Sequence, residues 1–247
     1  MESKTQYDNS GDTWLYKDRS ETASKRIERV FGDIKVENPG LGLNIYKNAF
    51  TKDQIDNIIN ALESNVGSGV YRWNEATVTN STTPIKKARD CVDFKMSRNS
   101  LGPRNEKNAA LHDVYETVFD TLKKCVDDYS KYWGIFVNWY EVFNFVKYEG
   151  EGKEFKIHGD HGPKYVCTVS AVIYLNDDYE GGEIHFPRLD DIVIKPSYGD
   201  IAVFPSNYIY EHASLPIKSG TKYCVVIMMD INDLGHKDNP YAVKVEQ

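Results

Sequence analysis

Between Gly134 and Asp230 the chain is built from short apolar segments, separated by turns rich in Gly, Pro and Asn. These segments are rich in β-branched and aromatic side chains, which favour strands. Many short strands at near-regular spacing are typical of a β-sandwich or β-barrel. We therefore predict a β core with strands at 138–148, 165–175, 181–187, 191–196, 199–205 and 222–230.

Two helices are predicted ahead of this core. A capping box at Thr51 and Gln54 marks the start of the first helix, and apolar residues at helical spacing follow from residue 55 to residue 62. The second helix covers 106–132 and ends at Gly134. Both helices should pack on the outer face of the β core. The core-facing stripe of the second helix is expected to consist of Leu111, Val114, Tyr115, Val118, Leu122, Cys125, Val126 and Tyr129.

The rest of the chain gives weaker signals. A strand is expected within 41–50 and shorter ones within 70–79 and 88–96, while the tail after residue 230 is polar and expected on the surface. The predicted organisation is an irregular lead-in (1–40) and a single domain (41–247) with its core at about 138–230. The fold class is mainly β with flanking helices (α+β), a double-stranded β-helix (jelly roll) core buttressed by N-terminal helices.

The motif HGDHG at 158–162 contains the first candidate metal ligands. His158 and Asp160 are two residues apart, so in an extended strand their side chains point the same way. His212 follows in YEHASLPI. Two histidines and one carboxylate make the facial triad of non-haem Fe(II) oxygenases, which leaves the other metal positions open. His161 is a rival ligand, but its spacing directs it off the strand face, so we expect it in an outer or surface position.

A second group of residues predicts an anion pocket. Lys222 opens the apolar run KYCVVIMMD, and strand parity places Ser170 and Tyr174 on one face of their strand. Together with Tyr148 they would offer hydroxyl donors and one cation in an apolar cavity, which fits one carboxylate of a small diacid. A buried lysine is costly without an anionic partner. The alternative is that Lys222 reaches solvent and the tyrosines are ordinary core residues.

Other polar residues carry less information. His112, His185 and His236 have no partner at suitable spacing and are expected to be structural or exposed. Arg89 and Arg98 could contact a substrate, although exposed surface charge is the simpler interpretation.

Composition argues against several classes. The net charge of −7 disfavours a general affinity for nucleic acid. The sequence has neither a long apolar run nor an apolar leader, so we expect no membrane span and a cytoplasmic protein. The four cysteines form no C-x-x-C pair, which argues against a zinc site. Cys125, Cys167 and Cys224 lie within apolar segments and are expected to be free buried thiols.

Five core segments form a series: FVKYEGEGKEFKIHGD, TVSAVIYLND, GGEIHFP, PSYGDIAVFP and HASLPIKSGTKY. This series resembles the core of Fe(II)/2-oxoglutarate-dependent dioxygenases, and within that superfamily it is most similar to the prolyl 4-hydroxylases. The resemblance covers roughly 138–230. The chain departs from it in GGEIHFP, where GGET is common, which leaves the subfamily open.

The resemblance implies a ligand set and a reaction. His158, Asp160 and His212 would bind Fe(II), and Lys222 would pair with the C5 carboxylate of 2-oxoglutarate. The positions that would donate to the same carboxylate are Tyr148, Tyr174 and, less securely, Ser170, which stands where the family usually has Thr. O2 would be consumed, 2-oxoglutarate converted to succinate and CO2, and ascorbate used as a supporting reductant.

The substrate stays open at this point. A peptidyl residue, with proline first, is implied by the likeness to procollagen-proline 4-dioxygenases, and the loops 65–105 and 149–155 could cover such a peptide. A free amino acid or small metabolite is the alternative. Nucleic-acid demethylation is disfavoured because KYCVVIMMD lacks the arginines that such relatives carry there. A non-catalytic metal- or peptide-binding module is the alternative of another class.

Overall fold

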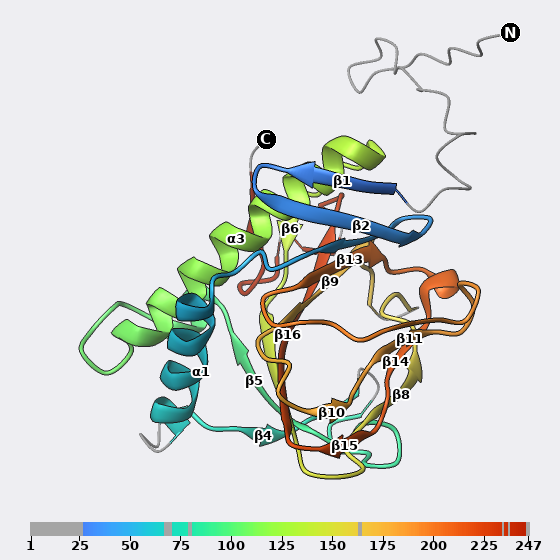
Figure 1. Cartoon of the computed structure of the whole chain (residues 1–247). Coiled ribbons are helices and arrows are strands. Elements are labelled where there is room, and N and C mark those ends of the chain that lie inside the picture. The colour runs from blue at the N-terminus through green and yellow to red at the C-terminus, as the bar shows by residue number, and fades with distance from the viewer. Residues whose placement is uncertain are drawn as a thin grey trace, which may run out of the picture.

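The computed structural model describes residues 27–245, except 67–70, 79–80, 163–164, 234 and 237. Within these residues two β-sheets face each other as a roll. Figure 1 shows helices α1 (Lys52–Val66) and α3 (Ala109–Trp133) on one side of the larger sheet, and the smaller sheet on its other side. This arrangement confirms the predicted mainly β fold with a jelly-roll core and flanking helices.

The strands are short, as the sequence predicts. The large sheet contains β1 (Ile27–Phe31), β2 (Ile34–Gly40), β3 (Leu43–Tyr46), β4 (Asn74–Glu75), β5 (Val92–Met96), β6 (Trp139–Tyr140), β7 (Phe143–Glu149), β9 (Val169–Tyr174), β13 (Ile201–Pro205), β16 (Thr221–Asp230) and β17 (Val243–Lys244). The small sheet contains β8 (Phe155–His158), β11 (Ile184–Phe186), β12 (Ile192–Ile194) and β14 (His212–Ser214). A ribbon pairs β10 (Glu180–Gly181) with β15 (Ile217–Ser219), and the remaining elements are α2 (Arg98–Leu101) and the 3-10 turn η1 (Tyr208–Tyr210).

Strand register decides which side chains enter the roll. Antiparallel pairing of β16 with β7 and β9 sets Lys222 opposite Tyr148 and Cys224 opposite Tyr174. Because side chains alternate along a strand, these four face the inside of the roll, and the residues between them face the helices. The core is therefore split into a cluster between sheet and helices and a second cluster inside the roll.

The two predicted helix signals are confirmed. At the start of α1, the Gln54 backbone N–H donates to Thr51 Oγ1 (3.2 Å) and the Thr51 N–H donates to Gln54 Oε1 (2.9 Å). Helix α3 ends at Gly134, whose φ of 70° is a left-handed conformation that glycine adopts at little cost. All eight residues of its predicted stripe are buried. In the described part of the chain, no helix is long and apolar enough to cross a membrane.

The prediction of an irregular lead-in up to residue 40 is wrong for 27–40. Strands β1 and β2 pair as a hairpin around Gly32, whose φ of 56° suits a tight turn. Arg29 anchors the hairpin to α3, because its Nη1 donates to Asp128 Oδ1 (2.8 Å) and its guanidinium lies 4.6 Å from the Tyr132 ring. Local sequence gave too little alternation to reveal a hairpin that depends on such long-range contacts. Residues 1–26 of the predicted lead-in lie outside the described residues.

The expectation of a surface tail is also wrong in part. Strand β17 pairs with β6, and His236 is only 3% exposed. Its Nδ1 lies 2.5 Å from Glu141 Oε1 and its Nε2 lies 2.8 Å from Asp230 Oδ2. His236 is therefore structural, which was one of its two expected roles.

Candidate metal and cosubstrate site

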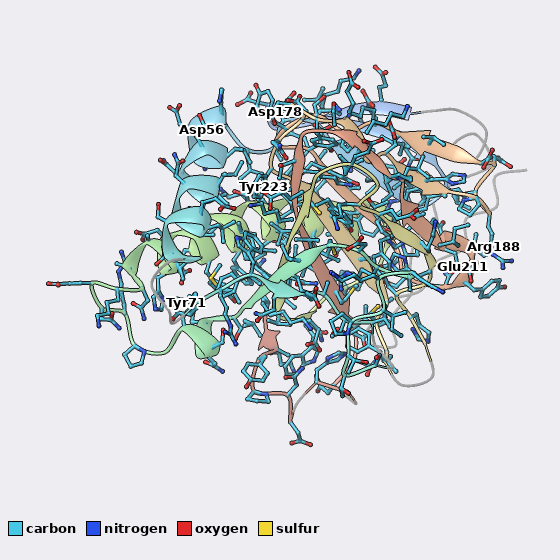
Figure 2. The ribbon with its side chains drawn as sticks, turned by 90° about the horizontal axis from the view of Figure 1, so that it is seen from below. Asp56, Tyr71, Asp178, Arg188, Glu211 and Tyr223 are labelled. Carbon is cyan, nitrogen blue, oxygen red and sulfur yellow. The ribbon has the colours of Figure 1, made fainter. Side chains whose placement is uncertain are left out.

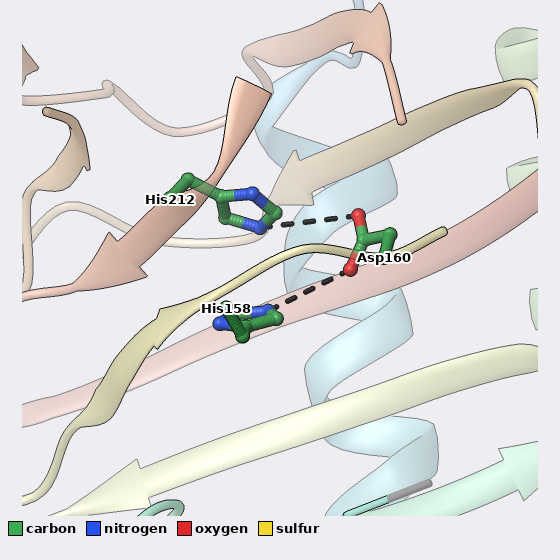
Figure 3. Close-up of side chains that lie close together, drawn as sticks. All are labelled: His158, Asp160 and His212. Carbon is green, nitrogen blue, oxygen red and sulfur yellow. Dashed lines mark ion pairs between the residues drawn. The ribbon is translucent and has the colours of Figure 1, made fainter. Parts of the chain in front are cut away.

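Three side chains converge where the small sheet meets the inside of the roll. Strands β8 and β14 pair so that His158 lies opposite His212. Strand β8 ends at His158, and the bend that follows it brings Asp160 to the same point. His158 Nε2 lies 3.6 Å from Asp160 Oδ1, and His212 Nε2 lies 4.0 Å from Asp160 Oδ2. Figure 3 marks both pairs with dashed lines. All three potential ligand atoms lie within 4.8 Å of one another, close enough to share one metal ion.

The backbone fixes which ring nitrogen faces this centre. His158 Nδ1 lies 2.8 Å from the Lys156 carbonyl, and His212 Nδ1 lies 3.1 Å from the Tyr210 carbonyl. A carbonyl can only accept, so each Nδ1 carries the hydrogen and each Nε2 presents a lone pair toward Asp160. Burial lowers the pKa of His158 to about 4, and repulsion from His212 adds to this effect. His158 is thus prepared as a neutral imidazole ligand, and the backbone holds the Nε2 of His212 toward the same point.

Ser170 holds the carboxylate of this group. Its hydroxyl donates to Asp160 Oδ2 (2.6 Å) and lies 2.7 Å from Ser206 Oγ. Ser170 does not line the cavity that contains Lys222. The structure therefore places it behind a potential metal ligand, whereas the resemblance implied a contact with the cosubstrate.

A cavity of about 80 Å³ runs from the three converging residues into the roll. Lys222 lines it and is only 2% exposed, so the alternative that this lysine reaches solvent is wrong. Its Nζ donates to the Gly182 carbonyl (2.7 Å) and to Ser214 Oγ (2.9 Å). No described carboxylate lies within ion-pair distance of Nζ, and burial lowers the pKa of this lysine. A buried cation without a counter-ion fits a carboxylate ligand.

The two predicted tyrosines flank this cation. Lys222 Nζ lies 5.2 Å from the ring centre of Tyr148 and 5.4 Å from that of Tyr174. Both tyrosines line the cavity, and burial raises the pKa of each well above its ordinary value. Both hydroxyls therefore stay protonated and available as donors at neutral pH.

A larger groove of about 650 Å³ begins at His158 and Asp160. Arg89 lines both the groove and the small cavity and is 8% exposed, so its expected surface position is wrong. Its guanidinium lies 5.0 Å from the Phe155 ring, which stacks on the His158 ring at a centroid distance of 3.6 Å. Arg89 is buried because the loop between β4 and β5 folds back onto β8. The Lys156 N–H donates to the Ala88 carbonyl (2.9 Å) and holds the loop there.

The other polar residues considered in the sequence lie outside this centre. His161 is exposed, and its Nδ1 lies 2.8 Å from the Cys167 carbonyl. His112 contacts the Gly102 carbonyl (3.1 Å) and His185 contacts Asp191 (2.5 Å). Arg98 pairs with Glu116 (2.9 Å) on the surface, as expected. All four cysteines are free and buried, which confirms the prediction made for Cys125, Cys167 and Cys224.

An ion pair next to the site involves the neighbour of His212. Glu211 Oε2 lies 2.6 Å from Arg188 Nε. Figure 2 shows this pair at the side of the molecule away from Asp56 in α1. It supports the turn that carries His212 without entering the cavity.

Sequence reasoning missed several cavity residues. Ser214 follows His212 by two positions and Asn144 precedes Tyr148 by four, so strand parity could have found both. Gly182 supplies a backbone carbonyl to Lys222, and a backbone contact has no side-chain signal.

Comparison with known families agrees with this geometry. Residues 143–229 match the family model of the 2OG-Fe(II) oxygenase superfamily. The segment 143–229 thus carries the signature of a 2OG-Fe(II) oxygenase domain. This family implies Fe(II), 2-oxoglutarate and O2, and the matched region contains all three converging residues and Lys222.

Individual relatives of the oxygenase domain are distant. Human procollagen-lysine,2-oxoglutarate 5-dioxygenase 2 is 27% identical over 126 residues, which is 50% of this chain and 16% of that protein. The chain thus spans about a sixth of the length of this relative.

Solved structures show the same fold. A prolyl hydroxylase from Trichoplax adhaerens, in complex with a hypoxia inducible factor peptide fragment, has a TM-score of 0.59 at 17% identity, covering 77% of this chain and 84% of that one. A Pseudomonas putida prolyl-4-hydroxylase has a TM-score of 0.55 at 16% identity, covering 78% and 94%. The viral collagen prolyl hydroxylase of Paramecium Bursaria Chlorella virus-1, as its 2OG complex, has a TM-score of 0.53 at 18% identity, covering 76% and 95%.

Proposed function

We propose that this protein is an Fe(II)- and 2-oxoglutarate-dependent dioxygenase that hydroxylates a peptidyl residue, with proline as the expected target. One observation carries the proposal. A single cavity has two imidazoles and a carboxylate at one end, and a buried lysine without a described counter-ion inside it. A metal and a dicarboxylate bound together would satisfy both features.

Each residue has a defined part in this proposal. His158, Asp160 and His212 would hold the iron, and Lys222, Tyr148 and Tyr174 would hold the C5 carboxylate of 2-oxoglutarate. When bound, iron and 2-oxoglutarate supply the oxidation: one atom of O2 enters the substrate C–H bond as hydroxyl, the other enters succinate, and CO2 is released.

The surrounding protein keeps the site ordered and dry. The Lys156 and Tyr210 carbonyls keep both Nε2 atoms aimed at Asp160. The rings of Phe204 and Phe186 lie 5.0 and 5.6 Å from the His212 ring and shield it from water on one side.

The groove supports a peptide as substrate. Its volume of about 650 Å³ is far larger than the cosubstrate cavity, and it opens from the same residues. A structural neighbour was solved with a peptide fragment bound. We extend the proposal to ascorbate as a supporting reductant and to the cytoplasm as the compartment, in keeping with four free cysteines.

The test incubates the protein with Fe(II), 2-oxoglutarate and ascorbate, and with panels of proline-containing peptides and free amino acids. We expect peptides to raise succinate release and to gain the mass of one oxygen on proline. Oxygen gain on free amino acids or small metabolites alone would contradict the peptidyl part of the proposal. Bound iron without any succinate, with or without substrate, would favour a non-catalytic binding module.

A further inference from the structure

Asn144 lies at the junction of the cosubstrate cavity and the groove. It is on the inner face of β7, four residues before Tyr148, and lines both spaces. In register it lies between Val226 of β16 and Lys95 of β5. The three side chains therefore form a row across the large sheet, from the cavity toward the groove rim.

The side-chain oxygen of Asn144 lacks a hydrogen-bond partner among the described residues. Its Oδ1 is buried and accepts no hydrogen bond from the described residues. An unpaired buried acceptor is unfavourable, so a ligand with a donor is expected beside it. A bound 2-oxoglutarate dianion offers no hydrogen to donate. A peptide bond offers both an N–H for Oδ1 and a carbonyl for Nδ2, which matches a primary amide.

Lys95 places a positive charge beside Asn144, at the groove end of this row. It is exposed, lines the groove, and forms no ion pair or hydrogen bond with any described residue. The other two cations of the groove have carboxylates nearby: Lys156 contacts Glu154 (2.6 Å), and Arg89 lies 3.5 Å from Asp93.

The described carboxylates that line the groove already have hydrogen-bond partners in the protein. Glu141 lines the groove, and its two oxygens contact His236 (2.5 Å) and Asn239 (2.8 Å). Asp160 is engaged by Ser170 within the converging group. Among the described residues of the groove, Lys95 is thus the ion that stays available to a ligand.

We infer that Asn144 and Lys95 form a substrate subsite that selects peptides with an acidic side chain next to the hydroxylated residue. Asn144 pairs with the peptide backbone beside the target, and Lys95 pairs with the acidic side chain. This inference rests on the proposed peptidyl hydroxylation.

The experiment measures kcat/KM for matched proline peptides that carry Glu, Gln or Lys on either side of the proline. For the wild type we expect the Glu peptide to exceed the Lys peptide by about two- to fivefold, the range of an exposed ion pair. Lys95→Glu should reverse this order. Lys107→Glu makes the same charge change before α3, outside the groove, and should keep the wild-type order.

Asn144→Leu tests the backbone contact. We expect kcat/KM to fall roughly tenfold on all peptides, as for one lost hydrogen bond that leaves its partner unpaired. Asn144→Gln keeps the amide and should lose less activity than Asn144→Leu. It therefore tests the contact even if Asn144→Leu folds poorly. If Asn144→Leu mainly raised the KM for 2-oxoglutarate, the inference would be overturned, because Asn144 would then contact the cosubstrate.

Two further results are decisive. Equal rates on Glu and Lys peptides, or an unchanged order in Lys95→Glu, would overturn the charge selection while leaving peptidyl hydroxylation intact. If no peptide is hydroxylated by the wild type although succinate forms, the proposed function itself fails, and the inference fails with it.

Discussion

Ser170 contacts a candidate metal ligand and does not line the proposed cosubstrate cavity. It donates to Asp160 Oδ2 over 2.6 Å, and that carboxylate would otherwise be free to turn between two histidines. Groups that orient a ligand in this way typically contribute 10- to 100-fold to metal affinity.

We therefore expect Ser170→Ala to weaken Fe(II) binding by about 10- to 100-fold, with little change in the KM for 2-oxoglutarate at saturating iron. Anaerobic metal titration and steady-state kinetics measure the two quantities. Ser206→Ala, which removes only the neighbour of Ser170, should have a smaller effect on metal affinity. A raised KM for 2-oxoglutarate with unchanged iron affinity would restore the cosubstrate role.

The burial that suits Lys222 to its proposed binding role should also make this residue costly for stability when no ligand is bound. Burial lowers its pKa from the ordinary value of 10.5, so between its folded-state pKa and 10.5 the unfolded chain holds more protons. In that window the stability contributed by this residue rises with pH.

We expect the stability difference between Lys222→Met and the wild type to shift in favour of the wild type from about pH 7 to about pH 10. Urea unfolding of both proteins without metal and 2-oxoglutarate measures it, and taking the difference cancels groups common to both chains. A difference that stays constant over this range would show that the lysine is not desolvated.

The sequence predicted which side chains face the inside of the roll, but it did not predict where along the cavity each one lies. Alternation along β16 and β9 placed Lys222, Tyr174 and Ser170 on inner faces, and the structure agrees. The alternation of side chains along a strand shows which face a residue lies on, but not its position along the cavity. Ser170 therefore met Asp160, because it pairs with Met228 near one end of β16 while Lys222 lies near the other.

At the scale of elements, His236 attaches the C-terminal segment to the roll. Its ring lies between Glu141, which precedes β7, and Asp230, the last residue of β16. Both carboxylates are buried, at 6% and 0% exposure, so removal of the ring would take one hydrogen-bond partner from each and leave only their other donors, such as Asn239 for Glu141.

We expect His236→Ala to lower the free energy of unfolding by about 3 kcal/mol, because two buried carboxylates each lose a hydrogen-bond partner. His185→Ala is the matched control, because its partner Asp191 is exposed and the loss should stay within about 1 kcal/mol. Urea denaturation measures both, and amide exchange should quicken in β17. Equal losses in the two variants would mean that His236 does not anchor the tail.

Elements with their own periodicity were predictable, and elements made by distant partners were not. Helix α3 has an apolar stripe and a glycine stop within its own sequence, and both appear in the structure. Strand β17 has two residues and is held by its pairing with β6, so its own sequence carries no strand signal. The β1–β2 hairpin alternates apolar and polar residues only over Ile34–Glu37, and its attachment to Asp128 of α3 comes from far along the chain.

On the scale of the whole molecule, the two faces of the large sheet have separate tasks. The face toward α1 and α3 carries the larger apolar cluster, and the face inside the roll carries the cavity. Lys222, His212 and Asn144 reach that cavity from three different strands. Ligands bound there would connect β7, β14 and β16, so cosubstrate binding should stabilise the entire fold.

The size of this stabilisation follows from linkage. With Fe(II) bound under anaerobic conditions, 2-oxoglutarate at about 100 times its Kd should add about 2.7 kcal/mol, which corresponds to roughly 5–10 °C in Tm for a chain of this size. Lys222→Ala should lose this shift at the same concentration, because the carboxylate would enter an apolar pocket without its cation. Lys218→Ala, an exposed lysine in β15, should keep the shift. Thermal unfolding with and without 2-oxoglutarate gives the comparison, and a full shift in Lys222→Ala would place the dicarboxylate site elsewhere.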